Sequence, residues 1–507
     1  MFLDELKKTL NAEFNESYTE NWALGYRTTG KNLLDLNYKV ASLRSENQNE
    51  IAASFKLAFY ENKLLALKWL FFASDVREGL GERRLFRIII KDLALNNPEY
   101  ISHLLRYIPE YSRWDNLLEM LGTPLENRVV EIIKNQLGED KANMNDGKSI
   151  SLLAKWLPSP TTSSKETVKK ARKLCALLGM SEKDYRKTLS SMRRYIDVVE
   201  VKMSANEWGK INYEGVPSKA NVLYKNAFLR NDEERRREYL AKLEKGEVRI
   251  NAGVLYPHDI VHAYLDRWHT LKPYDATLEN LWKSLPDLVW GSSGTIVVAD
   301  GSGSMGSQIG KTNVAALTVA NALAVYFAEK LSGDFKDKYI TFSHTPRLVD
   351  FSKCKNLKEK IELSYRYNEV ANTNIEAVFD LILTTAKRAN MKQGDLPQNI
   401  LVLSDMEFDM ATSGPVKLNE KLFETIDGKY KEAGYRLPRL VFWNLNDRTG
   451  TIPVIENDLG VALVSGFSVN IVKMVLSGEL DPFKCLAERL TGERYDRIVL
   501  PESERWE

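Results

Sequence analysis

Acidic and hydroxyl side chains follow an apolar run in the second half of the chain. Asp300, Ser302 and Ser304 alternate with glycines directly after the run Thr295-Ile296-Val297-Val298-Ala299. A continuous Val- and Ile-rich run ended by glycines predicts a buried central strand of an α/β sheet. In open α/β sheets, ligands bind outside the carboxyl ends of the strands. Hard oxygen donors without Cys or His suit Mg²⁺ or Mn²⁺. The spacing therefore predicts a metal site at this turn.

Two further segments supply the remaining predicted ligands. A second apolar run, Ile400-Leu401-Val402-Leu403, leads to Asp405, and Thr373 lies in a polar turn before the amphipathic stretch 375–389. Ends of parallel strands meet at one edge of a sheet, so these groups are expected to converge. The predicted metal ligands are Asp300, Ser302, Ser304, Thr373 and Asp405. The alternative interpretation is that these are ordinary turn and N-cap residues.

The elements that must position these residues differ between the two parts of the chain. From about residue 290, strand-length apolar runs alternate with helical stretches, which predicts a doubly wound, mostly parallel sheet with helices on both faces. Earlier residues show helical spacing almost throughout. The expected fold class is α + α/β, with a helical domain at 1–288 and an α/β domain at 289–507. Predicted strands are 295–299, 339–343, 347–351, 400–404, 439–443 and 461–466, and helices before residue 288 are predicted at 52–73, 84–95, 99–107, 125–137, 167–178 and 220–245.

Composition bounds the class of protein. The 507 residues include 71 Lys and Arg and 69 Asp and Glu, so net charge indicates no partner. Cys175, Cys354 and Cys485 are few and widely spaced, which indicates a reducing compartment without disulfides. Apolar stretches such as 64–73 are too short to span a bilayer, and no secretory signal is visible. We expect a cytoplasmic protein with no membrane partner.

One stretch of the helical part is basic. Between Lys165 and Arg230, fifteen Lys and Arg stand against seven Asp and Glu, with Tyr185, Tyr195 and Tyr213 among the interleaved aromatics. Basic groups attract phosphates and aromatic rings stack unpaired bases, so the stretch is a candidate for binding single-stranded RNA. The alternative is a solvated helix surface with core aromatics. Candidate RNA-binding residues are Lys169, Lys170, Arg172, Lys173, Arg186, Lys187, Arg193 and Arg194.

Two other motifs are candidates for phosphate binding and zinc binding. The segment Gly306–Thr312 resembles a phosphate-binding loop, but that loop needs four residues between its glycines and here Gly306 and Gly310 enclose three. His258 and His262 share a helix face at the spacing of a zinc motif, although Asp259 stands where a metalloprotease has Glu. No third zinc ligand is identifiable, and helix capping and packing are the alternative roles.

The order Asp-x-Ser-x-Ser, Thr, Asp resembles the metal-ion-dependent adhesion site (MIDAS) of von Willebrand factor A domains. The stretch Asp75–Arg83, the turn Tyr111–Asp115 and the A-domain motif together resemble the TROVE (Ro autoantigen) architecture and an uncharacterised Ro-like family of unknown function. This resemblance implies a HEAT-like array of helical repeats and binding of small or misfolded RNAs. Asn374 stands where A domains often carry Asp, which removes one negative charge and leaves the Thr373 ligand.

We therefore expect a non-enzymatic, Ro-like RNA-binding scaffold whose A domain holds Mg²⁺ or Mn²⁺ and recruits an acidic protein partner. One alternative is a metal-dependent protein-interaction module that binds no RNA. Another is a phosphodiesterase or NTPase, which needs a second metal or a placed general base. Glu407 and Asp409, just beyond the second apolar run, are expected to be solvated.

Overall fold

The computed structural model describes residues 10, 14–289, 294–310, 312–342, 345–368, 374–409, 422–454, 459–472 and 481–504. Its contacts divide the chain into two compact units. The first, the sheet unit, comprises residues 1–66, 78–80 and 252–493. The second, the helical unit, comprises residues 67–77, 81–251 and 494–507. Each is described by itself.

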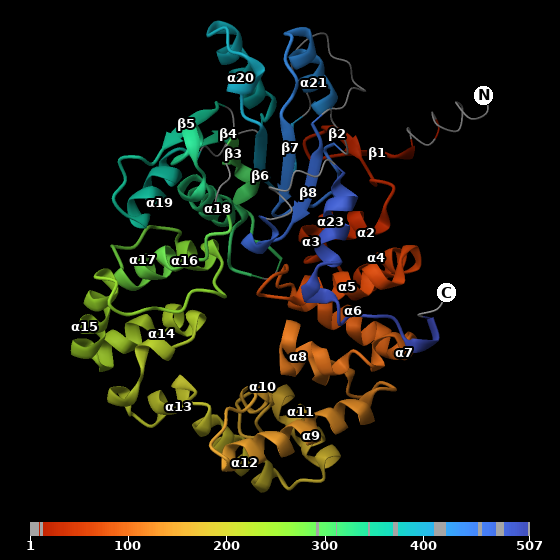
Figure 1. The fold of residues 1–507 in the computed structure, drawn as a ribbon, viewed down its shortest axis with the longest axis vertical. Coiled ribbons are helices and arrows are strands. Elements are labelled where there is room, and N and C mark those ends of the chain that lie inside the picture. The colour runs from red at the N-terminus through yellow and green to blue at the C-terminus, as the bar shows by residue number, and fades with distance from the viewer. Residues whose placement is uncertain are drawn as a thin grey trace. The chain divides into compact units, whose positions relative to one another are not determined.

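The sheet unit is built on six strands in the order β5-β4-β3-β6-β7-β8 (Figure 1). Only the β4–β5 pair among them is antiparallel, so β3 and β6 are parallel neighbours at the centre. Every residue of β3 is buried, as the unbroken Val and Ile run predicts. The strands are β3 (Thr295–Asp300), β4 (Lys338–Phe342), β5 (Arg347–Asp350), β6 (Asn399–Ser404), β7 (Arg439–Asn444) and β8 (Val461–Ser465).

Helices cover both faces of this sheet. Successive side chains of a strand point to opposite faces. In β7, the ring of Phe442 packs edge-on against Phe423 of α21 (Leu422–Glu432) at 4.9 Å, and Trp443 packs against Phe327 of α18 (Ala316–Lys330) at 5.7 Å. The helices α21 and α18 therefore lie on opposite faces. The predicted α/β architecture of this part of the chain is confirmed.

The first 66 residues belong to the sheet unit, a placement the sequence did not indicate. A hairpin of β1 (Glu16–Tyr18) and β2 (Leu24–Tyr26) lies within the part expected to be helical. Tyr26 and Ile452 exchange two backbone hydrogen bonds of 2.8 Å, which fasten the hairpin to the loop after β7. The helix α2 (Asn32–Tyr38) packs on β8. The predicted domain boundary between residues 288 and 289 therefore assigns these residues to a different domain from the sheet that they contact.

The helical unit consists of helices joined by short turns. Helix α9 packs against α11 and α12, and α14 packs against α15. Three predicted helices are divided. The stretch 52–73 breaks at Asn62 and the stretch 220–245 breaks at Asp232, where both residues leave helical geometry. The stretch 99–107 is divided into α7 (Pro98–Ser102) and a 3₁₀ turn at Leu105–Tyr107. The principal helices are α4 (Gln48–Glu61) in the sheet unit, α5 (Lys63–Ser74) across the division, and α6 (Arg83–Asn96), α9 (Glu126–Asn145), α11 (Lys165–Leu178), α12 (Glu182–Tyr195), α14 (Ser218–Asn231) and α15 (Glu233–Glu244).

None of the helices in the described ranges combines the length and apolar character that crossing a membrane requires.

Candidate metal centre at the edge of the sheet

The carboxyl ends of β3 and β6 bring four of the five predicted metal ligands together. Asp300 is the last residue of β3, and Asp405 follows β6 directly. Ser302 and Ser304 lie on the turn after β3, and their Oγ atoms are 3.0 Å apart. Thr373 lies outside the described residues. The predicted convergence of Asp300, Ser302, Ser304 and Asp405 is what the parallel pairing of β3 and β6 produces.

Both carboxylates are removed from solvent, with exposed fractions of 1% for Asp300 and 0% for Asp405. Burial raises the pKa of Asp300, and the charge of Asp405 raises it further. Burial also raises the pKa of Asp405, against the positive charge of Arg448 and a hydrogen bond from Ser304. Two carboxylates that share a buried site repel each other when both are ionised. A cation between them would relieve that repulsion.

Hydrogen bonds fix the orientation of Asp300. Its Oδ1 accepts from the backbone N–H of Ser302 at 2.9 Å, and its Oδ2 accepts from Ser404 Oγ at 2.6 Å. Gly301 lies close to Asn368: a Cβ at position 301 would be 3.2 Å from Asn368 Oδ1 and 3.4 Å from Asn368 Cα, so a larger residue would require Asn368 to shift. Asn374 does not take the place of the Asp that A domains often carry at this position. Its Oδ1 instead accepts from the backbone N–H of Ala377 at the start of α20 (Glu376–Arg388).

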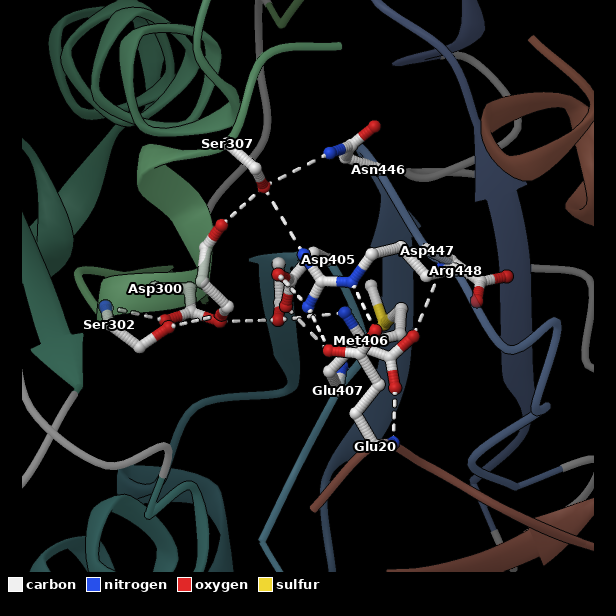
Figure 2. A network of polar contacts seen from close by, with 12 residues as sticks. Glu20, Asp300, Ser302, Ser307, Asp405, Met406, Glu407, Asn446, Asp447 and Arg448 are labelled. Carbon is white, nitrogen blue, oxygen red and sulfur yellow. Dashed lines mark hydrogen bonds and ion pairs between the residues drawn. The ribbon is translucent and has the colours of Figure 1, made fainter. Parts of the chain in front are cut away.

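Arg448, which the sequence did not single out, reaches into this site from the loop after β7 (Figure 2). Its guanidinium lies 3.5 Å from Asp405 Oδ2 and donates to Ser307 Oγ at 3.2 Å. Two bonds of 2.7 Å pair it with the carboxylate of Glu20 in the β1–β2 turn. Arg448 therefore places a positive charge beside Asp405, and the carboxylate of Glu20 balances that charge.

Glu407 is not solvated, so that expectation is wrong. Its side chain is fully buried, and both carboxylate oxygens are occupied by donors. Oε2 accepts from the backbone N–H of Glu20 at 2.7 Å, and Oε1 accepts from the backbone N–H groups of Arg448 and Thr449 at 2.9 and 3.0 Å. The chain turns sharply here, with Met406 at φ +63°. Glu407 thus ties the end of β6 to two other loops at the site.

The donor set fits a hard divalent cation. Two buried carboxylates and two hydroxyls are oxygen ligands of the kind Mg²⁺ and Mn²⁺ take. Across the described residues, no three His, Cys, Asp or Glu side chains are grouped so that they could hold a metal ion. Asp300, Ser302, Ser304 and Asp405 are the residues that would hold the ion.

The turn after β3 does not have the form of a phosphate-binding loop. Residues Gly303–Gly306 form a 3₁₀ turn, and α18 begins only at Ala316. In a phosphate-binding loop, the helix that follows directly after the Lys and Thr supplies N–H groups to the phosphate. Here Thr312 Oγ1 instead donates to the backbone carbonyl of Ile309 at 2.7 Å.

His258 and His262, which have the spacing of a zinc motif, are surrounded by groups that pack against the helix or cap it. They lie on α16 (Pro257–Tyr264), where Asp259 caps the helix by accepting from the backbone N–H of Tyr256 at 2.9 Å. The ring of His258 packs edge-on against Phe467 at 5.1 Å. Burial lowers the pKa of His262. Asp259 is therefore engaged in the helix cap, as the alternative interpretation of this motif expects.

The basic candidates on α11 and α12 separate into three groups. Lys170, Arg172 and Lys173 form ion pairs with Glu119 and Glu166, Glu182, and Glu126, respectively. Arg193 is half-buried and donates to the backbone carbonyls of Ala154 and Leu157 at 2.8 Å each, so its role is structural. The remaining four candidates are exposed and form no ion pair with any described residue: Lys169, Arg186, Lys187 and Arg194.

Two of the aromatic residues in the basic stretch, Tyr185 and Tyr213, are core residues. Tyr185 is fully buried and donates to the backbone carbonyl of Pro158 at 3.0 Å, and Tyr213 stacks on Tyr239 inside the unit. Neither presents a ring face on which a base could stack. Tyr195 is 38% exposed. The stacking surface expected for RNA is thus reduced to Tyr195 among these three tyrosines.

Comparison with known proteins finds families without a described activity. Residues 294–493, which include all six strands of the sheet, match a domain of unknown function (DUF7788), and residues 163–293 match another domain of unknown function (DUF2828). The chain is similar to the uncharacterized protein L728 of Acanthamoeba polyphaga mimivirus, with 30% identity over 509 residues that cover 92% of this chain and 85% of the viral protein.

Proposed function

The chain belongs to the family of the mimiviral protein L728, and we propose that it is a non-catalytic binding protein whose sheet edge holds Mg²⁺ or Mn²⁺. The observation that carries this proposal is the burial of two carboxylates, Asp300 and Asp405, at the ends of adjacent parallel strands. Asp300, Ser302, Ser304 and Asp405 hold the ion, and Thr373 is the proposed fifth ligand. Their order resembles the MIDAS of von Willebrand factor A domains, and the chain as a whole resembles the Ro-like architecture.

The partner group at this site is an acidic one. A bound divalent cation supplies a large local positive charge to which a carboxylate or phosphate is attracted. Arg448, which is paired with Glu20, lies beside Asp405 with 31% of its side chain exposed. Ser302 and Asp300 are held in place by the turn and by Ser404, so the site is preorganised on its strand ends. We assign the acidic group to a protein partner.

A binding role is favoured over hydrolysis by the state of the neighbouring carboxylate. A general base must have an oxygen available to the proton that it removes. Glu407 has both oxygens occupied by N–H and O–H donors from Glu20, Arg448 and Thr449. It therefore acts as a buried connector and not as a base.

The experiment for the main proposal uses a fluorescent hexaglutamate peptide as the acidic probe. Fluorescence anisotropy is measured with Mg²⁺, with Mn²⁺ and with EDTA, on the wild type, on Asp405→Asn and on the control Asp334→Asn, which changes an exposed residue of the same unit. Binding that requires the ion and is lost only in Asp405→Asn supports the proposal. Binding that is equal in EDTA overturns the metal-dependent recognition.

RNA binding is the second proposed function, and the exposed side chains of Lys169, Arg186, Lys187 and Arg194 favour it. Basic groups that form no ion pair remain available to phosphates, whose binding releases counterions and is weakened by salt. The test is a gel shift with single-stranded and structured RNA at several salt concentrations. Charge reversal of these four residues is expected to abolish binding. A control that reverses the ion-paired residues Lys170, Arg172 and Lys173 is expected to weaken binding less.

A further inference from the structure

A cavity of about 730 Å³ lies in the sheet unit beside helix α16. Its volume is within the range of small-molecule sites, roughly 300–1,000 Å³. The residues that line it and bear on its chemistry are Arg267, Trp268, His269, Lys272, Gln308 and Asn313. Neither the predicted metal ligands nor the basic helices α11 and α12 contribute to it.

A compact loop holds Trp268 at the rim of this cavity. The carboxylate of Asp266 accepts from the backbone N–H groups of Trp268 and Thr270 at 2.8 Å each, and a backbone bridge joins Leu265 to Leu271. The side chain of Trp268 nonetheless remains 72% exposed. A large indole kept in solvent by an ordered loop provides a flat surface for stacking.

The charge of the lining is basic. The Arg267 guanidinium lies 5.0 Å from the Trp268 ring centre, and Lys272 also lines the cavity. The only acid in the lining, Asp266, has one carboxylate oxygen engaged by two backbone donors. The cavity therefore presents cations beside an aromatic face, a combination that holds a phosphate next to a planar ring.

Neutral hydrogen-bonding groups complete the lining. Gln308 and Asn313 offer both donors and acceptors, the pattern that base edges require. Nδ1 of His262, on the cavity wall, is buried and has no hydrogen-bond partner among the described residues. Although His262, His269 and Asp266 share this cavity, the described residues include no three-residue His, Cys, Asp or Glu group able to hold a metal. The amide groups of Gln308 and Asn313, beside the basic groups, therefore suit an organic anion whose ring carries hydrogen-bonding groups.

We propose that this cavity binds a nucleoside phosphate, with the base on Trp268, the phosphate at Arg267 and Lys272, and the base edge at Gln308 and Asn313. The ligand is a free nucleotide or the terminal nucleotide of a single strand, since both present the same chemistry. This inference goes beyond the proposed function, because it needs neither the cation at the sheet edge nor the basic surface of α11 and α12.

The test is equilibrium binding to the full-length protein in EDTA, so that the metal centre does not contribute. The probes are AMP, adenosine, ribose 5-phosphate and a four-residue oligoadenylate. AMP is expected to bind more tightly than adenosine or ribose 5-phosphate. Equal affinity for AMP and the oligonucleotide identifies a free nucleotide, and tighter binding of the oligonucleotide identifies a strand end. Absence of binding by both AMP and the oligonucleotide overturns the proposal.

Matched tryptophan variants locate the binding. Trp268→Ala is expected to weaken AMP binding about 5- to 100-fold, and Trp268→Phe to restore most of the loss, because stacking needs only an aromatic face. Trp22→Ala is the control, since Trp22 is 71% exposed in the same unit and does not line the cavity. Equal affinities of the wild type and Trp268→Ala contradict the assignment to this cavity. Retained AMP binding with failed Mn²⁺ binding leaves this inference standing without the metal proposal.

Discussion

The hydroxyl of Ser404 donates a 2.6 Å hydrogen bond to Oδ2 of Asp300, which joins the carboxyl ends of β6 and β3. Both residues are buried, and Ser404 also accepts from the backbone N–H of Met406 at 3.0 Å. A hydrogen bond to an ionised carboxylate stabilises its charged form. Ser404 therefore keeps a buried acid closer to the ionisation state that a cation requires.

Replacement of this serine tests that role. Ser404→Ala is expected to raise the pKa of Asp300 further and to cost about 1.5–3 kcal/mol of unfolding free energy at pH 8, because a charged buried acceptor loses its donor. Urea denaturation in EDTA at pH 5 and pH 8 measures this. Ser74→Ala is the control, since Ser74 is buried and donates to a neutral carbonyl. If Ser404→Ala lowers the free energy of unfolding equally at pH 5 and pH 8, Ser404 does not act by stabilising the ionised form of Asp300.

The stability of the metal-free protein is expected to depend on pH through its buried acids. Burial raises the pKa of Asp300 to about 7, and the pKa values of Asp405 and Asp447 are raised as well. An acid with a raised folded-state pKa keeps its proton in the folded protein. The stabilising contribution of these acids is therefore largest below the ordinary Asp pKa of about 4 and is lost as the pH rises toward 7.

Between pH 4.5 and pH 8 in EDTA, the free energy of unfolding is expected to fall by about 2–4 kcal/mol less in Asp300→Asn than in the wild type, because the amide does not ionise. Chemical denaturation across that range provides the measurement. Mg²⁺ at pH 8 is expected to stabilise the wild type and not the variant, since an ion stabilises only the state that binds it. Parallel pH profiles for the two proteins would rule out Asp300 as a source of the dependence.

Glu407 is expected to be a major determinant of stability. Glu407→Gln replaces an oxygen acceptor by an amide donor that faces N–H groups, and a loss of about 2–4 kcal/mol is expected for such a buried mismatch. Hydrogen exchange should also become faster in the β1–β2 hairpin, which Glu407 holds through Glu20. Glu424→Gln is the control, because this exposed carboxylate bonds the same hairpin at Tyr26. Similar losses for both variants would contradict the connector role.

Glu20 is expected to support metal binding indirectly. Its two bonds to Arg448 hold the guanidinium and balance its charge beside Asp405. In Glu20→Gln, the uncompensated Arg448 charge should lower Mn²⁺ affinity about 3- to 10-fold, because like charges repel more strongly at a partly buried site. The double variant Glu20→Gln with Arg448→Gln should recover that loss. No recovery would mean that Glu20 acts through another contact.

The sequence predicts the sheet and the convergence of Asp300 and Asp405 at its edge better than it predicts what surrounds them. The runs at 295–299 and 400–403 are fully buried strands, and parallel pairing alone places Asp300 and Asp405 together. The strands β1 and β2 have three residues each, too few for a periodicity to be visible. Arg448 and Glu20 were missed because their roles arise only from segments more than 400 residues apart.

Local charge in the sequence also did not indicate which charged side chains are buried or ion-paired. Glu407 lies between Asp405 and Asp409 in the sequence, and only the tertiary structure shows the N–H groups that surround it. Lys170 and Lys173 belong to a basic run, yet Glu119 and Glu126 from other elements pair with them. The alternative interpretation of the basic stretch did include core aromatics, which the structure confirms for Tyr185.

Titration with Mn²⁺, followed by electron paramagnetic resonance of the free ion, tests the central claim most directly. One Mn²⁺ is expected to bind per wild-type chain and to be displaced by Mg²⁺. Affinity is expected to fall by at least about 10-fold in Asp300→Asn and in Asp405→Asn, given the effects seen when metal-site residues are changed, and to stay unchanged in Asp334→Asn. Equal Mn²⁺ affinity in the wild type and in both ligand variants would contradict a metal centre at this edge of the sheet.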